Sequence, residues 1–201
     1  MSNDERPQLN NADLSATLEF LREAERLKNV TRTSWTSSGQ QESVAAHSWR
    51  LALMALVLER EFPGVDTAKL LKMCVVHDLG EAIGGDISAK LQPPGGKAEQ
   101  ERRDLLQLLA PLPPHARDDI VGLWDEYEGG TSLEARVAKA LDKLETIMQH
   151  NQGLNPPSFD YRFNLDYGRR WTADDPVIAE IRSILDQETL ARAESRENDP
   201  A

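Results

Sequence analysis

Two of the four histidines of the chain, His47 and His77, lie in its most apolar segments. An imidazole buried there needs a polar partner, because burial of an unpaired polar group is costly. His77 is followed directly by Asp78, and Glu81 lies four residues after His77. A helical turn continued that far brings these three side chains toward one side. Asp86 follows two glycines, whose flexible backbone can direct its carboxylate to the same place.

A fourth acidic residue, Asp142, lies among apolar residues of a later predicted helix. A short connection favours antiparallel packing of the helices that carry His47 and His77. Two imidazoles and two carboxylates that converge from three helices would form a site for a divalent transition ion. A single buried histidine is more often a hydrogen-bonded core residue than a ligand. The order of His47, His77-Asp78 and Asp142 favours the metal site over that interpretation.

The elements that must position these residues are predicted to be helical, because apolar residues recur at spacings of three and four. The spacing predicts helices over about 14–29, 43–61, from Asp66 to Gly80, 97–110, 115–127, 133–149 and 176–193. Residues 31–42 form a polar stretch, and 155–175 look irregular. Trp49 and Trp124 lie at apolar-stripe spacing and are predicted to be core residues. No strand has a convincing alternation, so the fold class is predicted to be all-α.

The length and composition set further limits. A chain of 201 residues favours a single domain, here 1–201, with 1–10 and 194–201 as flexible tails. A net charge of −11 argues against binding nucleic acid or a membrane surface. The single cysteine, Cys74, fits a reducing compartment, and the sequence predicts neither a membrane span nor a signal peptide. We therefore expect a cytoplasmic protein.

The pattern resembles that of the HD-domain metal-dependent phosphohydrolases, and within them the 5′-deoxynucleotidase branch. The resemblance rests on segments 32–35, 42–47, 76–86 and 140–145 and spans a motif-bearing core of about 14–152. It implies a helical bundle with the metal site between its central helices. It also implies that the metal ligands are His47, His77, Asp78 and Asp142.

The same resemblance implies the roles of four further residues. Glu81 and Asp86 correspond to the catalytic and substrate-orienting carboxylates, with their division of roles left open. Arg32 corresponds to the residue that binds the phosphate, and Trp35 to the one that lies against the sugar. A planar guanidinium suits a phosphate dianion, because it pairs with two oxygens at once. In one bacterial subgroup this Arg and Trp are adjacent, whereas here two residues separate them.

The resulting hypothesis is a phosphomonoesterase that hydrolyses nucleoside 5′-monophosphates, deoxy forms especially, with a metal-activated water. One divalent ion is expected, cobalt, manganese or a similar ion, because His115, which a second metal would need, lies in an exposed-looking charged run. Two alternatives remain: hydrolysis of a nucleoside triphosphate or cyclic nucleotide, and a non-catalytic regulatory protein that binds nucleotides. The resemblance also implies a homodimer.

Overall fold

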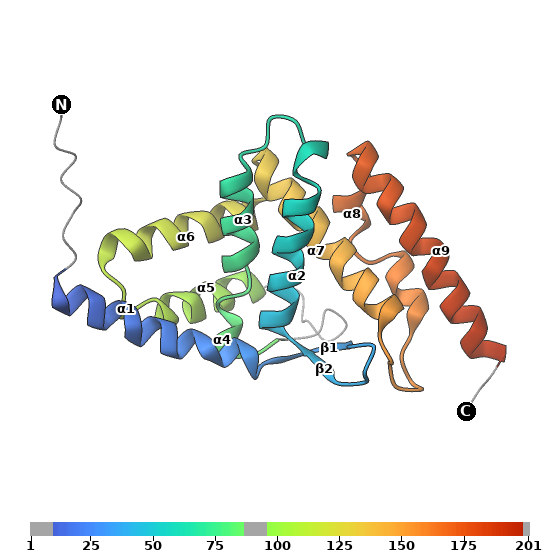
Figure 1. The fold of residues 1–201 in the computed structure, drawn as a ribbon, viewed down its shortest axis with the longest axis horizontal. Coiled ribbons are helices and arrows are strands. Elements are labelled where there is room, and N and C mark those ends of the chain that lie inside the picture. The colour runs from blue at the N-terminus through green and yellow to red at the C-terminus, as the bar shows by residue number, and fades with distance from the viewer. Residues whose placement is uncertain (1–9, 87–95, 199–201) are drawn as a thin grey trace.

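The computed structural model describes residues 10–86 and 96–198, and within these ranges the fold is helical apart from one small hairpin (Figure 1). The helices are α1 (Asn11–Ala24), α2 (Val44–Val57), α3 (Thr67–Val76), α4 (Glu81–Gly84), α5 (Lys97–Leu108), α6 (Pro114–Gly129), α7 (Leu133–Gln152), α8 (Arg169–Thr172) and α9 (Pro176–Asn198). Single 3₁₀ turns lie at Glu25–Lys28, Glu59–Glu61 and Tyr161–Leu165. The predicted all-α class is confirmed, with the hairpin as its exception.

Helix α7 is the central element of the bundle. It packs against α2, α3, α6, α8 and α9, and most of its side chains are buried. Figure 1 shows α2, α3 and α7 in the middle of the molecule, with α1, α5 and α6 on one side and α8 and α9 on the other. A helix buried on nearly all sides is typical of the centre of a bundle.

Two clusters of buried apolar side chains meet along α2 and α3. One cluster includes Leu51 of α2 and Leu70 of α3, and the other includes Val44 and Val76 of the same helices. His47 therefore lies on α2 between residues of the two clusters, and the segment after Val76 leaves α3 at their junction. The core thus fixes the positions from which the candidate ligands project.

Side-chain caps define where several helices begin. Ser43 accepts a hydrogen bond from the backbone N–H of Ala46 at the start of α2. Asp66 accepts from the N–H of Lys69 at the start of α3, at the predicted position. These bonds satisfy backbone donors that a first helical turn leaves unpaired.

The hairpin is a departure from the prediction for the polar stretch 31–42. Strands β1 (Thr31–Trp35) and β2 (Gln41–Ser43) pair antiparallel, with an irregular register between Thr31 and Trp35. Long-range hydrogen bonds hold the hairpin to α7: Arg32 donates to Thr146, and Gln149 donates to the carbonyl of Trp35. Because these partners are distant in sequence, local periodicity gives no sign of the strands.

Several predicted boundaries and one core assignment were wrong. The second predicted helix ends at Val57, before a 3₁₀ turn, and α7 continues to Gln152. Helix α9 runs to Asn198, so residues 194–198, predicted as tail, are helical. Trp124 is buried as predicted, but Trp49 is 66% exposed. The predicted tails also include residues 1–9 and 199–201, which lie outside the described residues.

None of the described helices is both long enough and apolar enough to cross a membrane.

Candidate active site

The segment after α3 carries His77 and Asp78 toward the centre of the molecule. Helix α3 ends at Val76, and a turn leads into α4, which begins at Glu81. This turn lies against α5, because a Cβ at Gly80 would come within 2.6 Å of the backbone oxygen of Glu101. Glycine is therefore required at position 80 for α4 and α5 to approach this closely.

The imidazole of His77 is oriented by the backbone of its own helix. Its Nδ1 lies 3.0 Å from the carbonyl oxygen of Cys74, to which it donates. The opposite nitrogen, Nε2, lies 3.0 Å from Asp78 Oδ2. The backbone carbonyl of His77 accepts a hydrogen bond of 2.9 Å from the indole of Trp124. Both ends of the residue are thereby held.

The imidazole of His47 is oriented by a carboxylate from α7. Its Nδ1 hydrogen-bonds Oε2 of Glu145, a residue with no exposed surface. The other oxygen of Glu145 accepts a bond of 2.6 Å from Arg50. Burial opposes ionisation of Glu145, but His47, Arg50 and Arg32 outweigh it and hold its pKa below the usual value. A charged carboxylate therefore fixes the ring of His47.

The four predicted ligands are brought together. His47, His77 and Asp78 present nitrogen and oxygen atoms that all lie within 4.8 Å of one another. Asp142 joins them, because its Oδ1 lies 3.0 Å from Nε2 of His47. Burial opposes ionisation of Asp78, yet His77, His47 and Arg32 hold its pKa far below the usual value. The pKa of Asp142 is likewise held low, by Lys143 and the two histidines against the effect of burial.

Two buried nitrogens at the centre of this cluster test whether a metal ion fits. Nε2 of His47 and Nε2 of His77 are both buried, and neither makes a well-aligned hydrogen bond with any described residue. In each ring the Nδ1 side is already engaged, so Nε2 is the atom left for coordination. Buried polar atoms are normally satisfied. Two inward nitrogens beside two ionised carboxylates therefore fit a divalent transition ion.

Arg32 of the hairpin faces the same cluster. One of its terminal nitrogens lies 3.5 Å from Asp78 Oδ2, and the other donates to Thr146 of α7 at 3.0 Å. Its Nε lies 3.5 Å from Glu42, a buried carboxylate of the neighbouring strand. Burial and the proximity of Glu145 raise the pKa of Glu42 to about 7, although Arg32 lowers it. The guanidinium is thus fixed next to the predicted ligands.

Glu81 and Asp86 stand beside the ligands. Glu81 is buried, and its Oε2 has no hydrogen-bond partner among the described residues. Burial, with the neighbouring Asp78 and Asp86 carboxylates, raises the pKa of Glu81 to about 10. Asp86 is half-buried beyond Gly85, whose φ is 75°. Burial raises its pKa as well, with Arg32 opposing and Asp78 adding to the shift.

The remaining sequence-predicted residues lie apart from this cluster. Trp35 packs edge-on against Phe159 at 6.4 Å between ring centroids, and within the described ranges it makes no hydrogen bond or ring contact with the four predicted ligands. His115 is exposed, as predicted. The fourth histidine of the chain, His150, is buried and hydrogen-bonded to Asn164.

Sequence reasoning assigned no role to three residues that shape the site. Glu145 lies behind His47 and orients its ring. Arg50 pairs with Glu145, and Tyr127 donates a bond of 3.2 Å to Asp142 Oδ2. A signal for Glu145 did exist: it lies three residues after Asp142, on the same face of an apolar helix.

Comparison with known proteins matches this chain to one class, helical proteins that carry an HD domain. The HD-domain family model matches residues 24–182, most of the chain. The chain therefore belongs to the HD-domain family.

Individual relatives agree with that assignment. The chain is 38% identical to the 5′-deoxynucleotidase HDDC2 of Bos taurus over 138 residues, which cover 67% of this chain and 66% of that protein. It is 34% identical to the protein of the same name from Dictyostelium discoideum, covering 68% and 76% of the two chains. A solved structure of a predicted metal-dependent phosphohydrolase from Magnetospirillum magnetotacticum superposes with a TM-score of 0.79 at 28% identity, covering 93% of this chain and 97% of the other.

Proposed function

We propose that this protein is a metal-dependent phosphomonoesterase that hydrolyses deoxynucleoside 5′-monophosphates to nucleoside and phosphate. The observation that carries the proposal is a pair of buried histidine Nε2 atoms that have no hydrogen bond to any described residue and face Asp78 and Asp142 beside Arg32. The 5′-deoxynucleotidases among the relatives support the substrate class.

His47, His77, Asp78 and Asp142 would hold one divalent ion. When bound, such an ion supplies an activated water and stabilises charge on a phosphoryl oxygen. Glu42, His47 and Glu145 form a second group that could hold a metal ion. It is a poorer ligand set than the first. It would use Nδ1 of His47, which Glu145 already engages, and both carboxylates face the arginines Arg32 and Arg50.

Arg32 would bind the phosphate of the substrate. Its guanidinium lies 3.5 Å from Asp78, and its contacts with Thr146 and Glu42 hold the guanidinium in place before a ligand arrives. An acidic protein needs such a local cation, because its overall field repels a dianion. Trp35, three residues further along the strand, would lie against the sugar.

Glu81 and Asp86 would share the proton transfers and the positioning of the sugar. The raised pKa of Glu81 keeps a proton on its carboxyl at neutral pH in the metal-free protein. That carboxyl can exchange a proton with the attacking water or with the leaving 5′-oxygen. Asp86, at the rim of the cluster, would then orient the substrate.

Activity after chelation tests the proposal. Purified protein treated with a chelator should lose phosphatase activity on dAMP and regain it with cobalt or manganese. A panel of ribose and deoxyribose monophosphates, a nucleoside triphosphate and a cyclic nucleotide, each with and without metal, defines the substrate class. Activity that survives chelation would contradict the metal mechanism. Preference for the triphosphate or the cyclic nucleotide would contradict the substrate assignment.

We further propose that two copies of the chain associate in the cytoplasm through the outer face of α2. The exposed side chains of this helix are all apolar, and the large ones are Trp49, Leu53, Leu56 and Val57. A face without charge is a surface on which two copies of a protein with a net charge of −11 can meet without close repulsion. Sedimentation should give a dimer for the parent chain and a monomer for Leu53→Glu. A monomeric parent chain would contradict this proposal.

A further inference from the structure

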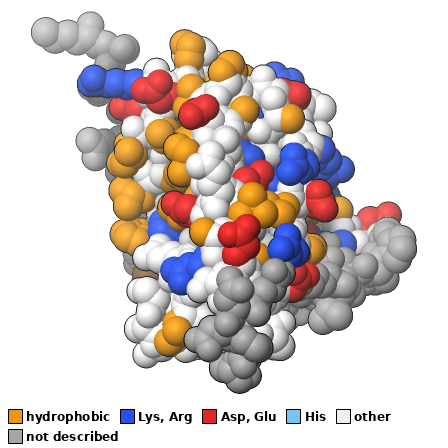
Figure 2. Space-filling model, turned by 90° about the vertical axis from the view of Figure 1, so that its right-hand side faces the viewer, with side chains coloured by type: hydrophobic (Ala, Val, Ile, Leu, Met, Phe, Trp, Pro, Cys, Tyr) orange, Lys and Arg blue, Asp and Glu red, His pale blue; other side chains and the backbone are white. Residues whose placement is uncertain are grey.

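A small pocket is lined in part by Lys143, whose ammonium group pairs with Asp142. It has a volume of about 330 Å³ and is lined by Lys143, Asp166, Gly168, Arg169, Arg170 and Trp171. Three of these side chains are cationic and one is acidic, in a chain that is acidic as a whole. Figure 2 shows the molecule from the side of α9, where acidic and basic side chains are interspersed. The pocket is therefore a local concentration of positive charge.

The wall of this pocket is held by a buried arginine from α9. Arg182 is 5% exposed and donates to the backbone carbonyls of Asn164, Leu165 and Tyr167. Its charge is balanced by Asp186, at 2.7 Å. The segment that carries α8 is thus fixed to α9 by hydrogen bonds, so the pocket needs little ordering when a ligand binds.

Gly168 brings this wall close to α7. Its φ is 69°, and a Cβ at this position would lie 2.5 Å from Cγ of Lys143. Any other residue would force the wall away from the lysine. The close approach places the α8 segment and Lys143 in one pocket.

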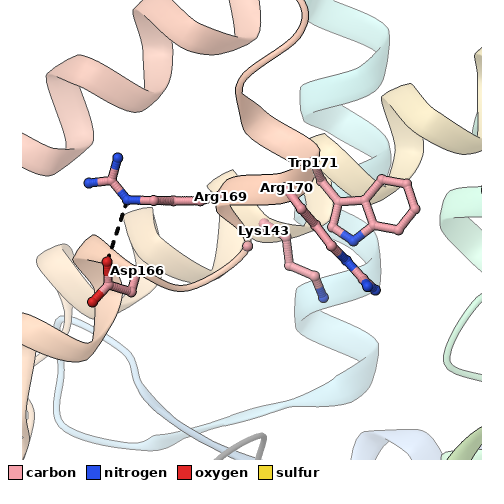
Figure 3. Close-up of a pocket in the computed structure, with 6 residues that line it drawn as sticks. Lys143, Asp166, Arg169, Arg170 and Trp171 are labelled. Atoms are coloured by element: carbon pink, nitrogen blue, oxygen red, sulfur yellow. Dashed lines mark ion pairs between the residues drawn. The ribbon is translucent and has the colours of Figure 1, made fainter.

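The cations of the pocket differ in how far their charge is already neutralised. Arg169 pairs with Asp166 at 3.6 Å and with Asp186 at 3.7 Å. Lys143 donates to Asp142 at 2.7 Å and to the hydroxyl of Tyr167 at 3.3 Å. Arg170 makes no ion pair within the described ranges and lies over the ring of Trp171, 4.8 Å from its centroid. Figure 3 shows Lys143 and Arg170 extending in the same direction, whereas Arg169 extends away toward Asp166.

We propose that this pocket binds a phosphate group between Lys143 and Arg170, and that its occupancy tightens metal binding at the neighbouring site. A compact anion fits better than a nucleobase, because Arg170 and Lys139 already cover the ring of Trp171. The guanidinium of Arg170 can pair with two phosphate oxygens, and Lys143 has a third N–H to donate.

The coupling follows from the contact between Lys143 and Asp142. The ammonium group lies against the carboxylate that the proposed metal would use, so it offsets part of that negative charge. An anion in the pocket would also pair with Lys143, so the lysine would offset less of the negative charge of Asp142. More of that charge would then be available to bind the metal ion. The coupling rests on the proposed metal site, whereas phosphate binding can be measured without metal, so the two can fail separately.

Calorimetric titration of metal-free protein with inorganic phosphate tests the site itself. We expect one site that Arg170→Ala weakens about tenfold, the loss of one charge-assisted contact. Arg103→Ala, which removes an exposed arginine on α5 whose hydrogen bonds within the described ranges go to Gln100, should leave it unchanged. Thermal melting of each variant shows that the fold is kept. No binding, or binding that Arg32→Ala removes and Arg170→Ala does not, would overturn the proposal.

Two further titrations identify the source of the phosphate and test the coupling to the metal site. In the Arg32→Ala background, a nucleoside 5′-monophosphate that binds more tightly than phosphate identifies a nucleotide as the source, and equal or weaker binding identifies free phosphate. Phosphate should also tighten manganese binding by about fivefold in the parent chain but not in Arg170→Ala. Manganese and phosphate also form complexes in solution, but this effect is the same for both proteins and cancels when they are compared. An equal shift in both would overturn the coupling.

Discussion

The two histidines at the centre of the site are held in different ways. His77 is oriented by a carbonyl of its own helix, at Cys74, so its position follows from the local fold. His47 is oriented by Glu145, a carboxylate 98 residues further along the chain, which is itself held by Arg50. The His77 half of the site is therefore set by backbone, and the His47 half depends on a buried charge network. The two halves should respond differently to substitution.

The largest effect is expected where the two halves meet. Asp78 Oδ2 lies 3.0 Å from Nε2 of His77 and 3.9 Å from Nε2 of His47. Asp78→Asn removes the negative charge next to both rings and should abolish metal binding and activity together. Metal content by elemental analysis, measured with turnover, checks this.

Glu81→Ala is the matched comparison for Asp78→Asn. Glu81 is beyond the four proposed ligands, so the variant should keep its metal while turnover falls by about 10²- to 10⁴-fold, the usual contribution of a general acid or base. Normal turnover in Glu81→Ala would contradict the role of that carboxyl. Retained metal in Asp78→Asn would remove Asp78 from the ligand set.

A smaller effect should separate the two halves. Glu145→Gln keeps the shape of the side chain. The amide has one oxygen and so cannot accept hydrogen bonds from both His47 and Arg50 with two oxygens, as the carboxylate does. Metal affinity should fall by about 10- to 100-fold, as for other residues that orient a ligand. Titration of metal-free protein with manganese measures it.

The control for the His77 half is Cys74→Ala. This change deletes a buried side chain but leaves the carbonyl that orients His77, so stability should fall by about 1 kcal/mol while metal affinity stays the same. Equal losses of affinity in Glu145→Gln and Cys74→Ala would contradict the difference between the halves.

The same contrast explains what the sequence could and could not predict. The helices depend on local spacing and caps, and the sequence predicted them with errors at the ends. The helix predicted from Asp66 to Gly80, for example, ends at Val76, and His77 and Asp78 lie in the turn that follows. The hairpin depends on bonds from β1 to α7, which no local pattern records. Trp49 shows a further limit: its spacing marks an apolar stripe of α2, but spacing does not tell which stripe the other helices cover.

An effect on stability alone is expected from the hydrogen bond behind His77. The indole of Trp124 donates to the carbonyl oxygen of His77 at 2.9 Å, and this side chain is 3% exposed. Trp124→Phe keeps a ring in the core but leaves that carbonyl without its partner, so the free energy of unfolding should fall by about 1–3 kcal/mol. Trp49→Phe, on the exposed face of α2, should change it by less than about 0.5 kcal/mol. Urea denaturation, in protein dilute enough to be monomeric, compares the two. If the variants lost equal stability, the tryptophan would not be what holds the backbone of the His77 half.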